Sequence, residues 1–213
     1  MEIKRAVEFG DNIKERLGEV YVNAFYDDVL KYFSNDKDKL KKVFACGFLL
    51  EYFYVAIMNN EIVGIIACMG KGEVFIKLEL KTFIKYLGVF RGFILNCFFK
   101  QFLKGFPKLD EKTALIECVA VDTKHQRKGI ASTFIKSLIA LSKYENYILE
   151  VIETNKKAIN LYDKLGFKVV YTKQYFPKAY FGMKYTTSTP SDSHQFLMSG
   201  TLSSLKTCQI GTL

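Results

Sequence analysis

The stretch between Val119 and Ile139 places a polar loop between two apolar runs, and the loop ends in basic residues and a glycine. A strand that leads through such a loop into a helix exposes the first backbone N–H groups of that helix. Those donors and the helix dipole attract phosphate oxygens. Gly129 lets the backbone approach an anion closely, and Arg127 and Lys128 add positive potential. The loop therefore indicates an anion site, with an ordinary solvated basic surface as the alternative.

Two common phosphate-binding motifs are absent from the chain. No GxxxxGK[ST] motif occurs, which argues against a Walker-type nucleotide hydrolase. No GxGxxG motif follows a strand, which argues against a dinucleotide-binding fold. An anion held by this loop must be recognised in another way.

The composition is typical of a globular protein with an anionic partner. Of 213 residues, 49% are hydrophobic and 25% charged, which suits one packed domain with or without an appendage. The net charge of +9 would match nucleic acid, a membrane surface or a phosphorylated cofactor. We expect no nucleic-acid partner, because no helix-turn-helix, zinc or RNP pattern occurs.

The cysteines and the N-terminus indicate a cytoplasmic protein. Its five cysteines are scattered and lack metal-ligand spacing, so we expect buried reduced thiols and neither disulfides nor a metal site. Charged residues follow Met1 where a secretory signal would be apolar. No apolar run reaches the roughly 18 residues of a membrane-spanning helix, so we expect no membrane span.

Periodicity in the first part of the chain predicts two helices and a hairpin. Apolar residues recur at helical spacing over 11–33 and 34–53, and two β-rich runs over 54–69 flank a turn dipeptide. The residues expected at the ends and turns of these elements are Asp11 for the first helix, Ser34 to Asp36 for the second and Asn59-Asn60 for the hairpin.

Residues 73–106 form an aromatic segment whose helical part carries only positive charges. It predicts one or two helices, with breaks at Gly88, Gly92 and Gly105. A buried helix or a lid over a substrate is favoured over a membrane-contacting amphipathic helix, because the basic residues form no dense face.

The second part of the chain alternates strands and helices. The polar loop leads into a helix that ends near Lys143, and the order strand, loop, helix, strand, helix predicts a mixed α/β core. The remaining elements are strands over Thr113–Val121 and Asn146–Glu153, a helix over Thr154–Phe167 capped by Thr154 and closed by Gly166, and a final antiparallel pair over 168–176 and 179–185.

Residues 186–213 are rich in serine and threonine and carry no net charge. This composition predicts a disordered or vector-derived tail, with a docking peptide as the less favoured alternative.

Two motifs in this part resemble signatures of the GNAT superfamily of N-acetyltransferases. Residues 126–131, QRKGIA, fit the loop pattern Q/R-x-x-G-x-A/G, and residues 154–167, TNKKAINLYDKLGF, fit N-x-x-A-x-x-L-Y-x-K-x-G-F. The resemblance is specific because both motifs occur in the family order with a strand between them. It covers roughly Thr113 to Tyr185, and no motif covers 73–106.

The resemblance implies an α/β (α+β type) fold. A single GNAT-like domain would span 1–185, with a mixed, centrally splayed β-sheet flanked by helices and 73–106 as an aromatic-rich helical insertion. It also implies acetyl-CoA as co-substrate, with the pyrophosphate on the loop and the pantetheine arm along the preceding strand. The residues expected to bind acetyl-CoA are Val119, Ala120, Val121, Gln126, Arg127, Lys128, Gly129, Ile130, Ala131, Asn155 and Tyr162.

By the same resemblance, Tyr162 matches the family tyrosine that protonates the leaving thiolate, and the backbone N–H of Val119 is the donor to the thioester carbonyl. The alternative role of Tyr162 is that of a core aromatic residue. The alternative role of Asn155 is that of a polar residue at the start of a helix. Cys118 is not a nucleophile, because it lacks a histidine partner and the family transfers the acetyl group directly. We expect His125 to be exposed.

Glu117 is the candidate base because it interrupts the apolar strand LIECVAV. Alternation predicts Glu117, Val119 and Val121 on one face of the strand. The opposite face would carry Ile116, Cys118 and Ala120. Glu150 is a weaker candidate, and the alternatives for Glu117 are an exposed or paired glutamate with water as the base.

The sequence thus predicts an N-acetyltransferase whose acceptor is a small-molecule amine or a protein amine. The alternative is a non-catalytic acyl-CoA-binding or sensing module on the same fold. The resemblance is also consistent with a homodimer through C-terminal strands.

Overall fold

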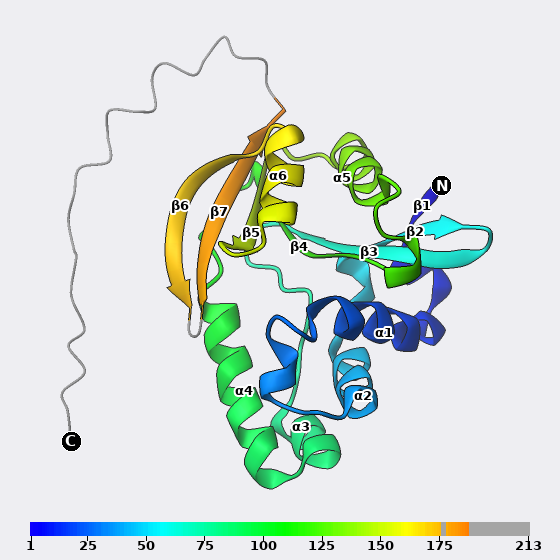
Figure 1. The fold of residues 1–213 in the computed structure, drawn as a ribbon, viewed down its shortest axis with the longest axis vertical. Helices are drawn as coiled ribbons and strands as arrows, with labels where there is room; N and C mark the ends of the chain where they lie inside the picture. Colours follow the sequence, from blue (N-terminus) through cyan, green and yellow to red (C-terminus); the bar gives the residue numbers. More distant parts are fainter. Residues whose placement is uncertain (176–177, 188–213) are drawn as a thin grey trace, which may run out of the picture.

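A mixed seven-stranded sheet with the order β1-β2-β3-β4-β5-β7-β6 runs through the computed structural model, which describes residues 1–175 and 178–187 (Figure 1). Helices cover both faces, which confirms the expected mixed α/β fold. The strands are β1 (Glu2–Arg5), β2 (Phe53–Met58), β3 (Glu61–Met69), β4 (Thr113–Val121), β5 (Asn146–Ile152), β6 (Lys168–Tyr175) and β7 (Lys178–Thr186). The α-helices are α1 (Lys14–Phe25), α2 (Lys37–Gly47), α3 (Leu80–Leu87), α4 (Val89–Lys104), α5 (Ile130–Leu141) and α6 (Lys156–Lys164).

The predicted helix over 11–33 is wrong in length. Helix α1 ends at Phe25, before two adjacent aspartates that the negative end of a helix dipole disfavours. A short 3₁₀ turn over Leu30–Tyr32 follows. Asp11 is not a cap, because it lies in a 3₁₀ turn of its own and forms an ion pair with Lys14 at 2.9 Å.

The second predicted helix and the hairpin are closer to the structure. Asp36 caps α2 by accepting a hydrogen bond from the N–H of Lys39 at 3.0 Å, but the helix ends at Gly47. Strands β2 and β3 form the predicted hairpin. Asn59 and Asn60 have φ of 50° and 62°, as a type I′ turn requires.

The aromatic segment forms α3 and α4, which break at Gly88 as predicted (φ 82°). Gly92 is not a break, because it lies inside α4 where the two helices touch. A Cβ atom at Gly92 would lie 2.8 Å from the backbone nitrogen of Ile84 and 2.8 Å from the carbonyl carbon of Phe83. Helices α3 and α4 therefore contact each other through their backbones.

We expect Gly92→Val to lower the free energy of unfolding by about 1–3 kcal/mol or more, because a side chain there must push the helices apart. Urea unfolding of the purified variant measures this change. Val89→Ala is a suitable control, since Val89 in the same helix is 70% exposed and its truncation should change stability by no more than ~0.5 kcal/mol. Wild-type stability in Gly92→Val would contradict the contact.

Two hydrophobic clusters lie on opposite faces of the sheet. Helices α1 to α4 contribute to one cluster, and α5 and α6 contribute to the other. Phe83, Leu95 and Phe99 of α3 and α4 are buried in the first cluster, so the segment is part of the core. This agrees with the expected buried helix.

The last strands form the expected antiparallel pair, and β7 reaches Thr186, the first residue of the predicted tail. Thr187 is also described, and residues 188–213 of that tail lie outside the described residues. Among the described cysteines, all free, Cys68 and Cys118 are buried, whereas Cys46 and Cys97 are exposed and depart from the prediction. No helix in the described part of the chain is long and apolar enough to cross a bilayer.

Candidate active site

The middle of the sheet opens where β4 and β5 separate. These parallel strands pair only from Thr113–Asn146 to Ile116–Leu149. Beyond that point β4 continues against β3 up to Val121, while β5 continues against β7 up to Ile152. The expected central splay of the sheet is therefore present.

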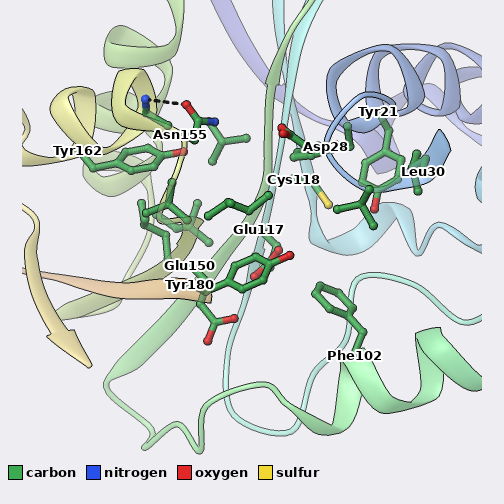
Figure 2. A pocket seen from close by; sticks show the side chains of 18 of the residues that line it. Tyr21, Asp28, Leu30, Phe102, Glu117, Cys118, Glu150, Asn155, Tyr162 and Tyr180 are labelled. Carbon is green, nitrogen blue, oxygen red and sulfur yellow. Dashed lines mark hydrogen bonds between the residues drawn. The ribbon is translucent and has the colours of Figure 1, made fainter. Parts of the chain in front are cut away.

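A cavity of about 170 Å³ lies at this opening (Figure 2). An apolar cavity of roughly 150 Å³ can hold a benzene molecule, so the enclosed space suits a small reacting group. The residues that line it are Tyr21, Phe25, Asp28, Val29, Leu30, Phe98, Phe99, Phe102, Ile116, Glu117, Cys118, Val119, Leu149, Glu150, Val151, Ile152, Asn155, Ala158, Tyr162 and Tyr180.

Strand β4 contains a bulge beside the cavity. Ala120 pairs with Ile65 and Glu117 with Ala67, so Cys118 and Val119 together oppose the single residue Ile66. Cys118 accordingly has a positive φ of 56°. Bulges occur often beside active sites, because they leave a residue outside the ladder and redirect side chains.

The bulge corrects the predicted alternation of faces. Ile116 lies with Val119 and Val121 on the α5–α6 face, although simple alternation placed it with Cys118. Cys118 and Ala120 pack toward α1 to α4. The extra residue shifts the alternation by one position, and no periodicity in the sequence marks it.

Glu117 is half-buried and faces the cavity. Burial, and secondarily the nearby Glu150 carboxylate, raises its pKa from 4.5 to about 8. Lys173 and the backbone N–H of Cys118 offset part of this increase. A carboxyl group with such a pKa can accept a proton near neutral pH.

Glu150, the weaker candidate, is held by other side chains. Its side chain is 5% exposed and forms an ion pair with Lys173 at 2.5 Å. It also accepts a hydrogen bond from the Tyr171 hydroxyl at 2.6 Å. Lys173 donates in turn to the carbonyl of Gly105 at 2.9 Å, so this network joins the end of α4 to the sheet. Both carboxylate oxygens of Glu150 are thus engaged.

Tyr162 and Asn155 reach the cavity from α6. The Tyr162 hydroxyl points toward the opening in Figure 2, and the side chain is 7% exposed. Burial and then Glu117 raise the pKa of Tyr162 well above its usual value, so the phenol stays protonated. Asn155 caps α6 by accepting a hydrogen bond from the N–H of Ala158 at 3.1 Å. The predicted cap at Thr154 is therefore wrong by one residue.

The polar loop lies beyond the cavity, at the far end of β4. Arg16 forms an ion pair with Asp122 at its start, and Asp122 also accepts a hydrogen bond from the N–H of Lys124. Gln126 donates to the carbonyl of Val121 at 3.1 Å. The Gln126 side chain therefore closes the loop onto the strand. His125 is half-buried, which departs from the expected exposure.

The loop has the features of an anion site. Gly129 has φ of 75°, and a Cβ there would meet no atom within 4 Å, so the backbone borders open space. The first hydrogen bond inside α5 runs from Thr133 to Gly129, and no side chain caps the helix. The N–H groups of the first turn therefore remain outside the helical ladder, beside the exposed Arg127 and Lys128.

The predicted site residues separate into two groups. Glu117, Val119, Asn155 and Tyr162 meet at the cavity, and residues 126–131 form the loop. Ala120 and Val121 follow Val119 along β4 and connect the two groups. The far wall of the cavity was not predicted, because no motif marks its residues and only long-range packing brings them together. The missed residues include Tyr21, Phe25, Asp28, Phe98, Phe102 and Tyr180.

The chain matches the model of a known protein family. The family model described as Acetyltransferase (GNAT) family matches residues 22–167. No curated protein sequence matches the chain significantly. Among the described residues, no group of three histidine, cysteine or acidic side chains is arranged to hold a metal ion.

Several solved structures share the fold. A "histone acetyltransferase HPA2 and related acetyltransferase" of Corynebacterium glutamicum ATCC 13032 is 18% identical with a TM-score of 0.60, over 89% of this chain and 97% of that one. An N-acetyltransferase of Staphylococcus aureus Mu50 is 17% identical with a TM-score of 0.58, over 87% and 100%. A ribosomal-protein-alanine N-acetyltransferase of Brucella melitensis is 16% identical with a TM-score of 0.54, over 87% and 99%. At these identities the likeness concerns the fold alone.

Proposed function

The chain belongs to the GNAT acetyltransferase family, and from this membership we propose that it moves the acetyl group of acetyl-CoA directly to an amine. One observation carries the proposal most strongly. A half-buried carboxyl group with a raised pKa, Glu117, and a buried phenol, Tyr162, face the same cavity where the sheet opens. Such a pair suits a reaction that removes a proton from one atom and delivers a proton to another.

The thioester of acetyl-CoA supplies a carbonyl carbon that a neutral amine can attack. In our proposal Glu117 removes the proton from the amine nitrogen, directly or through water. The backbone N–H of Val119 donates to the carbonyl oxygen as negative charge develops there. Tyr162 donates its proton to the sulfur as the carbon–sulfur bond breaks, so that free CoA leaves as a thiol. Each proton transfer of this type typically contributes about 10²- to 10⁴-fold in rate.

We assign the pyrophosphate of acetyl-CoA to the loop over 126–131. The N–H groups at the start of α5 would bind its oxygens, and Arg127 and Lys128 would balance its charge. The Gly129 conformation supports this assignment, because the backbone there borders open space. Gln126 would act indirectly by holding the loop against β4.

We expect acetyl-CoA to stabilise the wild-type protein and to lose this effect in Gly129→Glu. A ligand at about 100 times its Kd adds roughly 2.7 kcal/mol to the unfolding free energy, a Tm increase of about 5 °C or more. Thermal unfolding with and without acetyl-CoA measures the shift for each variant against its own ligand-free form. Each variant is compared with its own ligand-free form because a side chain at position 129, where φ is 75°, also strains the free protein.

Ala140→Glu is the matched control for this experiment. It adds the same charge to the same helix, at an exposed position near the opposite end. Its acetyl-CoA shift should equal that of the wild type. An unchanged shift in Gly129→Glu, or the lack of a shift in the wild type at millimolar acetyl-CoA, would contradict the cofactor assignment.

Release of CoA thiol in the presence of a panel of amines tests the proposed reaction itself. Amine-dependent release supports an acetyltransferase. Acetyl-CoA binding without CoA release in the presence of any amine would favour the non-catalytic acyl-CoA-binding module instead.

We propose the cytoplasm as the site of the reaction, because the exposed Cys46 and Cys97 are free thiols, as is usual in a reducing compartment.

A further inference from the structure

We propose that the acceptor is a small primary amine with an aromatic or bulky apolar body and without a carboxylate group. This inference rests on the acetyl transfer proposed above and names the class of substrate for that site. It depends on the wall of the cavity opposite α6. We call this surface the acceptor wall, and it consists of Tyr21, Phe25, Asp28, Phe98, Phe102 and Tyr180.

Most of the acceptor wall lies across the cavity from the cofactor side. In Figure 2, Asn155 and Tyr162 lie on one side, and Tyr21 and Phe102 lie on the other. Asp28 and Glu117 lie between the two sides in this view. An amine that reaches Glu117 from the far side would therefore leave the rest of its body against the acceptor wall.

Aromatic rings supply most of this wall and support one another. The ring centroids of Tyr21 and Phe25 are 4.9 Å apart, and Tyr21 also lies 4.8 Å from the buried Phe44. Phe98 and Phe102 of α4 stack at 6.5 Å, nearly parallel. Rings packed in this way form a firm apolar surface, which favours another ring or a branched aliphatic group by edge and offset contacts.

The carboxyl side chains of the cavity have no basic counterpart among its described lining residues. Asp28, Glu117 and Glu150 line it, and no lysine or arginine does so among the residues whose side chains the structure describes. This contrasts with the net charge of +9 for the whole chain. Lys173 pairs with Glu150 from outside the lining set. An ammonium group entering the cavity thus meets Asp28, and also Glu117 once that group ionises near pH 8, and these carboxylates can compensate its loss of hydration.

A carboxylate on the acceptor would meet the opposite situation. It would lie near Asp28, with no guanidinium or ammonium group among the described lining residues to receive it. An unpaired buried charge is strongly disfavoured. The cavity therefore selects against free amino acids. Amino sugars would lose hydrogen bonds to water against the aromatic rings, and polyamines would have to bury a second cation.

Matched amines test this inference through CoA release. We expect 2-phenylethylamine to react with a kcat/KM at least about 100-fold above that for L-phenylalanine, since the two differ only in the carboxylate. Phenylalaninamide should recover most of the loss, because it keeps the α-substituent without the charge. Glucosamine and spermidine should be at least about tenfold poorer than 2-phenylethylamine.

Variants at Asp28 test whether this side chain sets the preference for an amine without a carboxylate. With 2-phenylethylamine as the acceptor, Asp28→Asn should raise KM about tenfold, and Asp28→Arg should shift the preference toward phenylalanine. Asp27→Asn is the control, since Asp27 is exposed and lies outside the cavity lining. The acetyl-CoA thermal shift should be the same in all of these variants, which separates acceptor recognition from folding.

Isothermal titration of 2-phenylethylamine and phenylalanine into the CoA-saturated protein gives a second readout that requires no turnover. Preferential binding of 2-phenylethylamine without any CoA release would overturn the proposed reaction but keep the acceptor class. Equal or better use of phenylalanine, glucosamine or spermidine would overturn the inference and keep the reaction. A poor rate for phenylalaninamide would show that shape excludes phenylalanine, and the charge argument would fail.

Discussion

Glu117→Gln should lower kcat by about 10²- to 10⁴-fold, because glutamine has the shape of glutamate but cannot accept the proton of the amine. In the wild type, kcat should rise with pH up to about 8, where Glu117 becomes ionised, and then level off. The variant should lose this dependence. Steady-state CoA release between pH 6 and 10, at saturating acetyl-CoA, measures both effects.

The same substitution should increase stability at alkaline pH. Below the pKa of 4.5, both the folded and the unfolded Glu117 are protonated, and burial carries no charge penalty. Between 4.5 and about 8 the unfolded chain ionises while the folded chain keeps the proton, so stability falls as pH rises. The slope is about 1.4 kcal/mol per pH unit, and the total is on the order of 5 kcal/mol. Glutamine does not ionise and removes this loss.

Thermal unfolding at pH 5 and pH 8 checks the stability effect. At pH 8, Glu117→Gln should unfold several degrees above the wild type, and at pH 5 the two proteins should differ much less. Glu61→Gln makes the same chemical change at an exposed position of β3 and should leave both activity and Tm unchanged. Full activity in Glu117→Gln would assign the base role to water. An equal Tm at pH 8 would show that Glu117 is not desolvated.

Tyr162→Phe should lower kcat by about 10²- to 10⁴-fold and leave acetyl-CoA affinity within about twofold. The variant removes only the hydroxyl and keeps the ring, which lies 6.0 Å from that of Phe167. Because the raised pKa keeps Tyr162 protonated, no loss of activity on the alkaline side should accompany the rise that Glu117 causes. CoA release and the acetyl-CoA thermal shift, measured on one preparation, separate the two quantities.

Tyr185→Phe is the matched control for the phenol. Tyr185 also packs against Phe167, with ring centroids 5.4 Å apart, and lies outside the cavity lining. Its variant should turn over at the wild-type rate. A similar decrease in both variants would indicate that the Phe167 region has been disturbed. Wild-type kcat in Tyr162→Phe would exclude this hydroxyl as the acid.

Local patterns in the sequence predict the elements around the site well. The apolar run over Thr113–Val121 predicts β4 with the bounds that the structure shows, and the Asn59-Asn60 turn predicts the β2–β3 hairpin. Both signals come from neighbouring residues and need no tertiary context. The two signature motifs likewise coincide with the start of α5 and with α6.

Features that depend on pairing between distant segments were not predictable in this way. The bulge at Cys118 exists only in register with β3, and it moves Ile116 to the face of Val119. The apolar periodicity also continues past the true end of α1. At the start of α6, Asn155 rather than Thr154 is the cap, because its side chain accepts a hydrogen bond from the N–H of Ala158. The acceptor wall combines residues from α1 and the turn after it, from α4 and from β7, which no local window contains together.

The division of the core into two clusters bears on how this fold can evolve. Helices α3 and α4 pack into one cluster, while α5 and α6, which present the loop proposed to bind acetyl-CoA and Tyr162, pack into the other. Changes at Phe98 or Phe102 can therefore reshape the acceptor wall without disturbing the packing beneath the loop. Under the proposed function, descendants of this sequence could exchange one amine for another by drift within α4 while keeping the proposed acetyl-CoA site unaltered.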